Sequence, residues 1–334
     1  MRRAGVSAHG KTGTSRSEGA IDTAADFPRR ASLINILLSI AYLYFIHCTT
    51  GLKIEHIGLI GVYNLGFVAH RTTRKLVSAL AVFLIFGILY DIMKVHPNYL
   101  VSTVDFEDIY NLEKLLFGIH TQSGVLTVNE YFQYHHSTTL DLTAGIFYLN
   151  WMSVPLLFAV YLYFSDKKLY LRYALAFLFV NILGFCLYYI YPAAPPWYIA
   201  QYGFVFDDTV LGSAADLLRF DELVGIGIFE TIYTRNSNVF AAVPSLHSAY
   251  PVVVLYYGAK KRIPLLTGFL AVYMLGIWFA AVYSGHHYII DVILGVLCAI
   301  VGIVVFHGIL LRRPGIRALL ARYERFISSR GEAL

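Results

Sequence analysis

The sequence predicts an all-α, polytopic membrane helix bundle with about eight transmembrane helices. Hydrophobic residues make up 57% of the 334 residues and charged residues only 14%, whereas soluble domains carry about 25% charged residues. Long apolar stretches recur along the chain at lengths close to the roughly 20 residues that cross a bilayer. Lysine and arginine cluster after every second stretch, which is the pattern of a chain that crosses the membrane repeatedly.

Eight apolar stretches define the predicted spans. The second and the sixth are shorter than the others, and the second is also compatible with a helix lying in the membrane interface. In chain order the predicted spans are 31–48, 54–69, 76–93, 142–164, 170–191, 244–259, 264–283 and 287–311. Residues 31–311 are therefore predicted to form one transmembrane domain.

Basic residues predict the orientation of these spans, because cytoplasmic loops collect lysine and arginine. They occur before the first span and after the second, fourth, sixth and eighth: Arg29 and Arg30; Arg71, Arg74 and Lys75; Lys167, Lys168 and Arg172; Lys260, Lys261 and Arg262; Arg312, Arg313 and Arg317. Both termini are therefore predicted to be cytoplasmic. The loops after the third, fifth and seventh spans are predicted to be extracytoplasmic.

The two ends of the chain differ from the apolar domain between them. Residues 1–30 are rich in Ser, Thr, Gly and Ala and lack an apolar core, which predicts a disordered cytoplasmic tail. Residues 312–334 form a basic cytoplasmic tail in which arginines are interleaved with apolar side chains. That pattern suits an amphipathic helix on the headgroups, with a plain solvated tail as the alternative.

The two long extracytoplasmic loops contain further structure. Apolar residues recur near helical spacing in 106–117, which predicts an interfacial helix. Three prolines in 192–196 end the fifth span and direct the chain out of it. Trp197 and Tyr198 follow them, and amphipathic rings of this kind suit headgroup depth. We therefore expect both rings near the substrate.

Two short motifs, 244–247 (Pro-Ser-Leu-His) and 285–291 (Gly-His-His-Tyr-Ile-Ile-Asp), stand at the extracytoplasmic ends of the sixth and eighth spans. Polar residues are costly at membrane depth, so ordered sets of them at helix ends predict a site. His287 and Asp291 are four residues apart, which places them on one face of a helix. His247 supplies a second imidazole from another helix.

The expected helix starts also favour an anion. Pro244 suits the first residue of a helix, and Ser245 with the following N–H groups then faces a phosphate near His247. For the eighth span we expect Ser284 or Gly285 as the cap, with His287 in the first turn. His286 points about 100° away from His287 on such a helix and is expected to be a spectator.

These residue types predict phosphoryl transfer. A neutral His287 oriented by Asp291 can attack phosphorus and form a phosphohistidine, while His247 acts first as general acid and then as general base. Helix ends and basic side chains can stabilise the phosphoryl oxygens, so the mechanism needs neither a metal nor a cofactor. The three cysteines are scattered singly in apolar stretches and predict no disulfide or metal site.

The motifs resemble those of a known family. Pro-Ser-x-His followed by His-x-x-x-Asp is similar to the second and third signatures of the type 2 phosphatidic acid phosphatase superfamily. Its members use a histidine nucleophile without a metal, and its membrane members are six-helix bundles. The resemblance covers about 76–311 and implies His287 as nucleophile, Asp291 as its partner and His247 as acid and base.

The chain departs from the phosphatase pattern in two places. The first signature is not found upstream of Pro244, and Ala280 and Ala281 occupy positions where the third signature normally has Ser-Arg. Inositol phosphorylceramide synthases and their bacterial relatives share these departures. Four stretches resemble that subgroup, namely 194–198, 212–221, 243–249 and 286–291. In place of the missing cations, Arg219 or Arg235 is expected to bind phosphate through a guanidinium.

The resemblance implies a transferase that moves a phosphoinositol-like headgroup from a glycerophospholipid to a ceramide or a similar lipid alcohol, including a diacylglycerol-like one. Asp216 and Asp221 are expected to accept hydrogen bonds from a polyol headgroup. The main alternative is a phosphatase for a lipid phosphate or polyprenyl pyrophosphate. A transporter is disfavoured, because the polar residues gather at one interface and not at mid-span. Membrane lipids are the expected partners and nucleic acid is not; the oligomeric state stays open. A bacterial inner membrane is the expected location.

Overall fold

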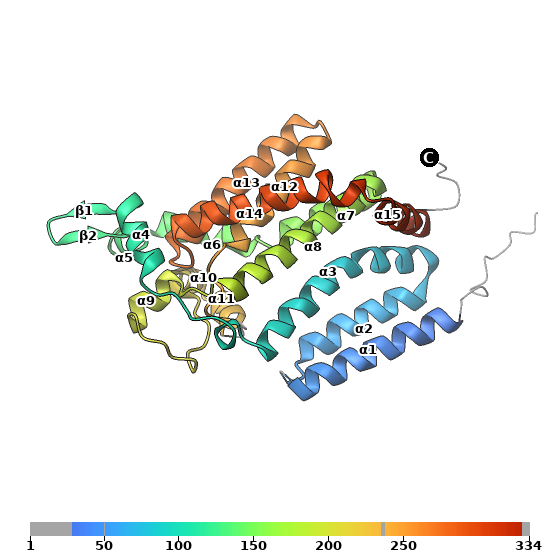
Figure 1. The fold of residues 1–334 in the computed structure, drawn as a ribbon, viewed down its shortest axis with the longest axis horizontal. Coiled ribbons are helices and arrows are strands. Elements are labelled where there is room, and N and C mark those ends of the chain that lie inside the picture. The colour runs from blue at the N-terminus through green and yellow to red at the C-terminus, as the bar shows by residue number, and fades with distance from the viewer. Residues whose placement is uncertain (1–28, 50, 235–237, 329–334) are drawn as a thin grey trace, which may run out of the picture.

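A computed structural model describes residues 29–49, 51–234 and 238–328 of the chain, and these residues form a helical bundle (Figure 1). The long helices run between two ends of the bundle, and short helices with one hairpin gather at one of them. The helices are α1 Arg29–Thr49, α2 Ile54–Ala69, α3 Arg71–Val95, α4 Asp108–Phe117, α5 Val128–Tyr134, α6 Thr138–Leu149, α7 Ser153–Ser165, α8 Lys167–Ile190, α9 Pro196–Tyr202, α10 Leu218–Val224, α11 Ile228–Tyr233, α12 Leu246–Lys260, α13 Pro264–Tyr283, α14 Ile289–Gly308 and α15 Pro314–Ile327. The antiparallel strands are β1 Ile119–Thr121 and β2 Gly124–Leu126.

The predicted all-α membrane bundle is confirmed. Among the described residues, α1, α3, α8, α13 and the stretch Ile289–Arg312 are long and apolar enough to cross a membrane. The pair α6 and α7 reaches that length together but is bent by 43°. Helices form at the second and sixth predicted spans too, as α2 and α12, and these are the two that the sequence marked as short.

The fourth predicted span is broken, which corrects the prediction of one continuous helix over 142–164. Asn150 closes α6, and its side-chain amide donates to the carbonyl of Ile146 at 2.8 Å. Pro155 lies in the first turn of α7, where it has no N–H to donate to the preceding turn. The break leaves Trp151 between the two helices, with its ring 4.7 Å from the ring of His247.

The start of α12 is pressed against α14, and this contact brings the two motifs together. A Cβ added at Gly295 of α14 would come within 2.1 Å of the Ser245 carbonyl oxygen, so only glycine fits there. The Ser245 N–H donates to the Asp291 carbonyl oxygen at 3.0 Å. His247 and His287, forty residues apart in the chain, therefore meet at one end of the bundle.

The opposite end of the bundle carries the C-terminal helix. The C-terminal tail forms a helix, α15, which packs against α3 and α8 (Figure 1); its predicted place on the headgroups stays a prediction. Ile327 is buried, and the Tyr323 hydroxyl donates to the Ser78 carbonyl oxygen. Helices α1 and α2 lie along the outer side of α3, away from α13 (Figure 1).

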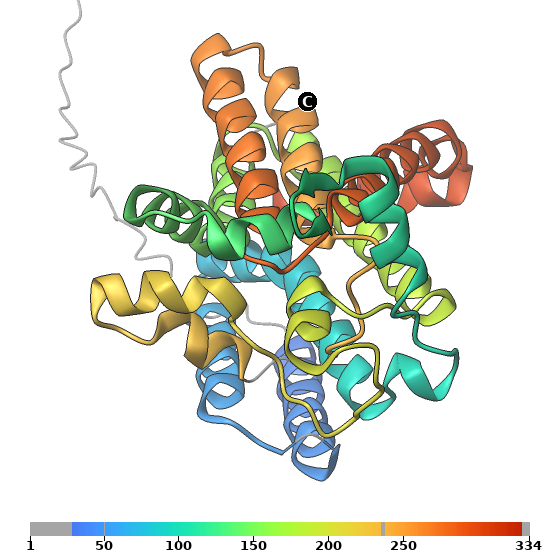
Figure 2. The ribbon, with the colours of Figure 1, turned by 90° about the vertical axis from the view of Figure 1, so that its left-hand side faces the viewer.

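Short elements cover the end of the bundle that holds the motifs, as the end-on view shows (Figure 2). The helix predicted over 106–117 is present as α4, and α9 begins at Pro196. The hairpin of β1 and β2, which the sequence did not predict, separates α4 from α5. Asn98 ties the covering loops to α8, because its buried amide donates to the carbonyls of Tyr188 and Phe240 at 2.9 Å each.

Candidate active site

His287 lies in the turn between α13 and α14, which corrects its predicted place in the first turn of a helix. The helix begins at Ile289 with Tyr288 as its N-cap, and not at Ser284 or Gly285. The turn passes through a left-handed glycine, Gly285 at φ 72°, a conformation that glycine adopts without steric cost. The His287 N–H then donates to the Ala281 carbonyl oxygen at 3.0 Å, which fixes the residue against the end of α13.

Asp291 and His287 are paired as the sequence predicted, although by a different backbone path. The Oδ2 atom of Asp291 lies 3.5 Å from Nδ1 of His287. The same oxygen accepts the Tyr288 N–H at 2.9 Å and so caps α14 from its third residue. Asp291 is fully buried and His287 is 5% exposed, so the carboxylate holds the ring in a site that water hardly reaches.

His247 completes a line of three side chains. It lies in the first turn of α12, and its Nδ1 atom is 3.2 Å from Nε2 of His287. Ser245 is the N-cap of that helix and Pro244 precedes the cap. This corrects the prediction that Pro244 is the first helical residue. The rings of Trp151 and Tyr148 pack on the His247 imidazole at centroid distances of 4.7 and 5.2 Å.

The environment of His287 favours its neutral form. Burial lowers the pKa of the His287 imidazole to about 4, because a charged ring loses its hydration there. Asp291 lies 3.5 Å from Nδ1 without a hydrogen bond; a proton on Nδ1, facing this carboxylate, would leave the lone pair on Nε2. Nε2 is the atom that faces His247, at 3.2 Å from its Nδ1.

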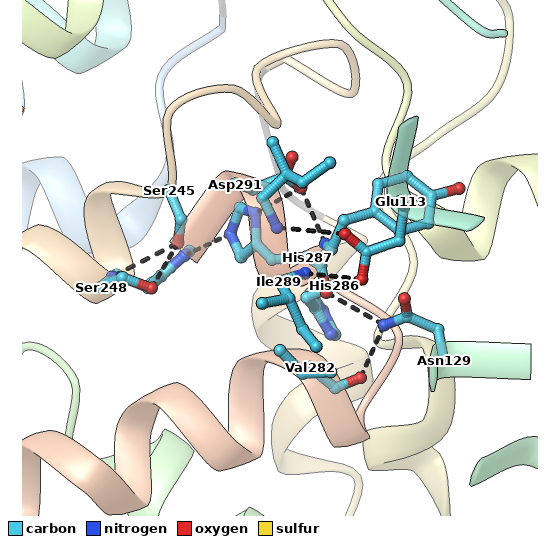
Figure 3. A network of polar contacts seen from close by, with 12 residues as sticks. Glu113, Asn129, Ser245, Ser248, Val282, His286, His287, Ile289 and Asp291 are labelled. Carbon is cyan, nitrogen blue, oxygen red and sulfur yellow. Dashed lines mark hydrogen bonds and ion pairs between the residues drawn. The ribbon is translucent and has the colours of Figure 1, made fainter. Parts of the chain in front are cut away.

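Glu113 of α4 is part of this site, and the sequence analysis missed it. Its buried carboxylate accepts the N–H groups of Ile289 and Ile290 at 3.0 and 3.1 Å (Figure 3). Burial raises the pKa of Glu113 to about 7, and the two N–H donors oppose that rise. A protein carboxylate therefore occupies the anion site at the start of α14. One signal was available, because Glu113 follows Ile109 by four residues on the buried face of α4.

Asn129 of α5 is a second residue that was not predicted. Its buried amide donates to the carbonyls of Val282 and His287 at 2.7 and 2.9 Å (Figure 3). The two bonds join the last turn of α13 to the turn that carries the histidines. Since α5 belongs to the cover over the bundle end, this cover fixes the backbone of His287.

His286 has its own buried surroundings. Its Nδ1 lies 3.0 Å from the Ser284 hydroxyl oxygen, and its ring packs on Tyr233 and Tyr148 at 4.5 and 5.2 Å. Burial, with the neighbouring His287, lowers the pKa of this imidazole well below its usual value. Tyr148 thus contacts the rings of both His286 and His247.

The arginine and aspartates proposed for the substrate lie in protein networks. Arg219 donates from Nε to Asp141 at 2.7 Å, and its Nη1 is 2.9 Å from Asp216. Asp221 accepts the N–H groups of Phe229 and Glu230 and thereby caps α11. Arg235 lies outside the described residues. Arg219, Asp216 and Asp221 thus all have protein partners.

The other predicted substrate contacts are also buried. Trp197 and Tyr198 are 6% and 0% exposed and pack beside Phe240, so their rings contact protein and not the headgroup layer expected for them. The backbone N–H of Trp197 donates to the Gly285 carbonyl oxygen at 2.9 Å, which joins α9 to the turn that carries His286 and His287. The Ser245 hydroxyl accepts from the Ser248 backbone N–H at 3.3 Å, as the N-cap of α12, and from the Ser248 hydroxyl at 3.0 Å (Figure 3).

An aspartate and two histidines thus meet at the mouths of apolar helices and form the candidate phosphoryl-transfer site. The model of the PAP2 superfamily matches residues 107–305, and the chain belongs to this superfamily. The family predicted from the two motifs is thereby confirmed.

Named relatives narrow the family further. A phosphoinositol dihydroceramide synthase of Bacteroides thetaiotaomicron is 48% identical over 90% of this chain and 99% of its own length. Inositol phosphorylceramide synthase of Candida albicans is 25% identical over 79% of this chain and 55% of its own length. The catalytic subunit of the Saccharomyces cerevisiae enzyme is 35% identical over 35% of this chain and 29% of its own length. No solved structure matches the chain at a significant level. The predicted subgroup is therefore confirmed.

Proposed function

We propose that this chain transfers phosphoinositol from an inositol glycerophospholipid to a ceramide or dihydroceramide through a phosphohistidine at His287. The observation that carries the proposal is the line of Asp291, His287 and His247, with Nε2 of His287 turned towards Nδ1 of His247. The bacterial relative named for phosphoinositol and dihydroceramide shares nearly the full length of the chain and supports the choice of both lipids.

The first step breaks the donor lipid. Nε2 of His287 attacks the phosphorus of the phosphodiester, and the bond from phosphorus to the diacylglycerol oxygen breaks. His247 gives that oxygen a proton, so diacylglycerol leaves as a neutral alcohol. The anionic diester beside the ring favours the protonated form of His247 that this step requires.

The second step reverses the proton transfer. The primary hydroxyl of the ceramide takes the place of the departed diacylglycerol, and neutral His247 accepts its proton. The hydroxyl oxygen attacks phosphorus, the bond between phosphorus and Nε2 breaks, and His287 is restored. One phosphodiester is exchanged for another, without net gain or loss of a proton. His287 is buried and His247 is half-buried, which favours a lipid alcohol over water as the acceptor.

The orientation in the membrane belongs to the same proposal, with both termini in the cytoplasm of a bacterial cell and the histidines on the periplasmic face. Basic residues gather at the bundle end opposite the histidines, where the Tyr257 hydroxyl donates to the Arg172 carbonyl oxygen at 3.0 Å and lies 2.8 Å from Nε2 of His307. Such residues mark cytoplasmic loops. In a cysteine-free background, an impermeant maleimide should label Ser123→Cys in intact spheroplasts and Lys260→Cys only after lysis. The reverse labelling pattern would refute this topology.

The function is tested with purified enzyme in vesicles that contain phosphatidylinositol labelled in the inositol ring. We expect label to move into a ceramide phosphoinositol only when ceramide is supplied, with diacylglycerol released in equal amount. His287→Gln should lose both products, and His120→Gln, an exposed histidine on β1, should retain them. Release of soluble inositol phosphate regardless of ceramide would identify a phosphatase and overturn the proposal.

A further inference from the structure

A cavity of about 240 Å³ opens beside His247 and is lined mainly by apolar and aromatic side chains. Its walls come from α3, α8, α12 and the break between α6 and α7, and include Phe86, Trp151, Phe185 and Tyr250. Ligand pockets commonly measure about 300–1,000 Å³. This smaller cavity therefore suits the head of a lipid and the first part of its chains, with the remaining chain in the bilayer.

Asn238 contributes an amide side chain to this lining, beside His247 and four tyrosines. Its side chain is buried, with 6% of the residue exposed, and it lies in the loop before the motif of Ser245 and His247. Within the described part of the chain, neither its amide oxygen nor its amide nitrogen has a hydrogen-bond partner. Buried polar groups are nearly always hydrogen-bonded, so this amide is placed to bond a group that enters the cavity.

The two free atoms of Asn238 specify the chemistry of that group. The amide nitrogen donates and the amide oxygen accepts, so full pairing requires a ligand with both an acceptor and a donor. The amide of a ceramide offers both, as a carbonyl and an N–H. Its nitrogen is bonded to the carbon next to the one that carries the primary hydroxyl. The esters of a diacylglycerol offer only acceptors and would leave the Asn238 oxygen unpaired.

We infer that Asn238 and the aromatic cavity form the acceptor subsite, which selects an N-acyl amino alcohol over a diacylglycerol; this inference rests on the proposed function. The lipid amide bonds Asn238 while the neighbouring hydroxyl reaches His247. His247 takes the hydroxyl proton, the oxygen bonds phosphorus, and the bond from phosphorus to His287 breaks. Asn238 is thus a specificity residue that orients the acceptor.

The test compares two acceptors of the same phosphoenzyme. Asn238→Leu keeps the approximate shape and removes both hydrogen-bonding atoms. We expect kcat/KM for ceramide to fall by at least about tenfold, since a buried hydrogen-bond pair is lost. Exchange of the labelled headgroup between phosphatidylinositol and added diacylglycerol should stay within about twofold of wild type. Asn111→Leu, an exposed asparagine on α4, is the matched control and should leave both rates unchanged.

A modified acceptor separates recognition from structural damage. Ceramide methylated on its amide nitrogen cannot donate to Asn238, so wild type should use it poorly and Asn238→Leu should lose little more. Equal losses of transfer and exchange in Asn238→Leu, or no loss of either, would overturn the inference while the proposed function stands. Absence of any ceramide product with wild type would instead refute the proposed function.

Discussion

Nδ1 of His247 and Nε2 of His287 lie 3.2 Å apart, and the two residues come from different helices and from motifs forty positions apart. A phosphorus atom bonded to Nε2 has to enter between the two rings, so substrate binding must part them slightly. Asp291 lies on the far side of His287 and holds that ring in place. We therefore expect the His247 ring, which packs on Trp151 and Tyr148, to be the one that moves when substrate binds.

Removal of His287 and removal of His247 should differ in their effects on the reaction. His287→Gln should abolish both transfer and the labelled phosphoenzyme, because the attacking nitrogen is lost. His247→Gln should slow both half-reactions by about 10²–10⁴-fold, as expected for a lost general acid and base. Rapid-quench experiments with phosphate-labelled donor measure the acid-labile phosphoenzyme directly. A phosphoenzyme of normal yield in His287→Gln would assign the nucleophile to another residue.

Activity should depend on pH through His287. Its pKa is lowered to about 4, so the nucleophile stays neutral down to about pH 5 and becomes protonated below that. The donor half-reaction should therefore keep its neutral nucleophile down to about pH 5 and lose it at lower pH. Between pH 6.5 and 4 the unfolded chain binds a proton that the folded chain does not, so His287 contributes stability that is lost as pH falls. A half-reaction that already fails near pH 6.5 would contradict the neutral, buried ring.

Glu113→Gln should lower kcat with little change in donor KM, because Glu113 fixes the start of α14 through two N–H groups and does not face the substrate. Its pKa is raised to about 7, so between pH 4.5 and 7 the folded chain keeps a proton that the unfolded chain has lost. The contribution of Glu113 to the free energy of unfolding therefore falls as pH rises from 4.5 to 7.

The control for Glu113 is Glu107→Gln, an exposed glutamate just before α4. Thermal unfolding of both variants is followed at pH 5 and pH 7.5. The change in melting temperature between the two pH values should be altered in Glu113→Gln and should match wild type in Glu107→Gln. Unchanged kcat and an unchanged pH response in Glu113→Gln would leave Glu113 without the positioning role.

Local spacing predicted much of the site, whereas contacts between distant segments had to come from the structure. His287 and Asp291 were matched because they are four residues apart, and the pairing survives although His287 precedes the helix. The spacing from Ile109 places Glu113 on the buried face of α4, but its bonds to backbone N–H groups 176 and 177 residues away come only from the structure. Arg219 was predicted to bind phosphate in place of the missing cations, and the structure adds its partner Asp141, 78 residues away in the chain.

Arg219→Met should destabilise the protein and should not act mainly on donor binding. The guanidinium pairs with Asp141 at 2.7 Å and with Asp216 at 2.9 Å, and Asp141 is 6% exposed. Loss of one partner of a buried ion pair typically costs about 3–5 kcal/mol, because the other charge stays buried without compensation.

Thermal unfolding in detergent measures the cost of Arg219→Met, with Arg322→Met on the exposed face of α15 as the control. The control should change the free energy of unfolding by no more than about 0.5 kcal/mol, as is usual for surface sites. Adding Asp141→Asn to Arg219→Met should recover part of the loss, since it removes the charge left unpaired. A raised donor KM at unchanged stability would instead support phosphate binding by Arg219. Loss of a guanidinium that binds the diester would weaken donor binding alone.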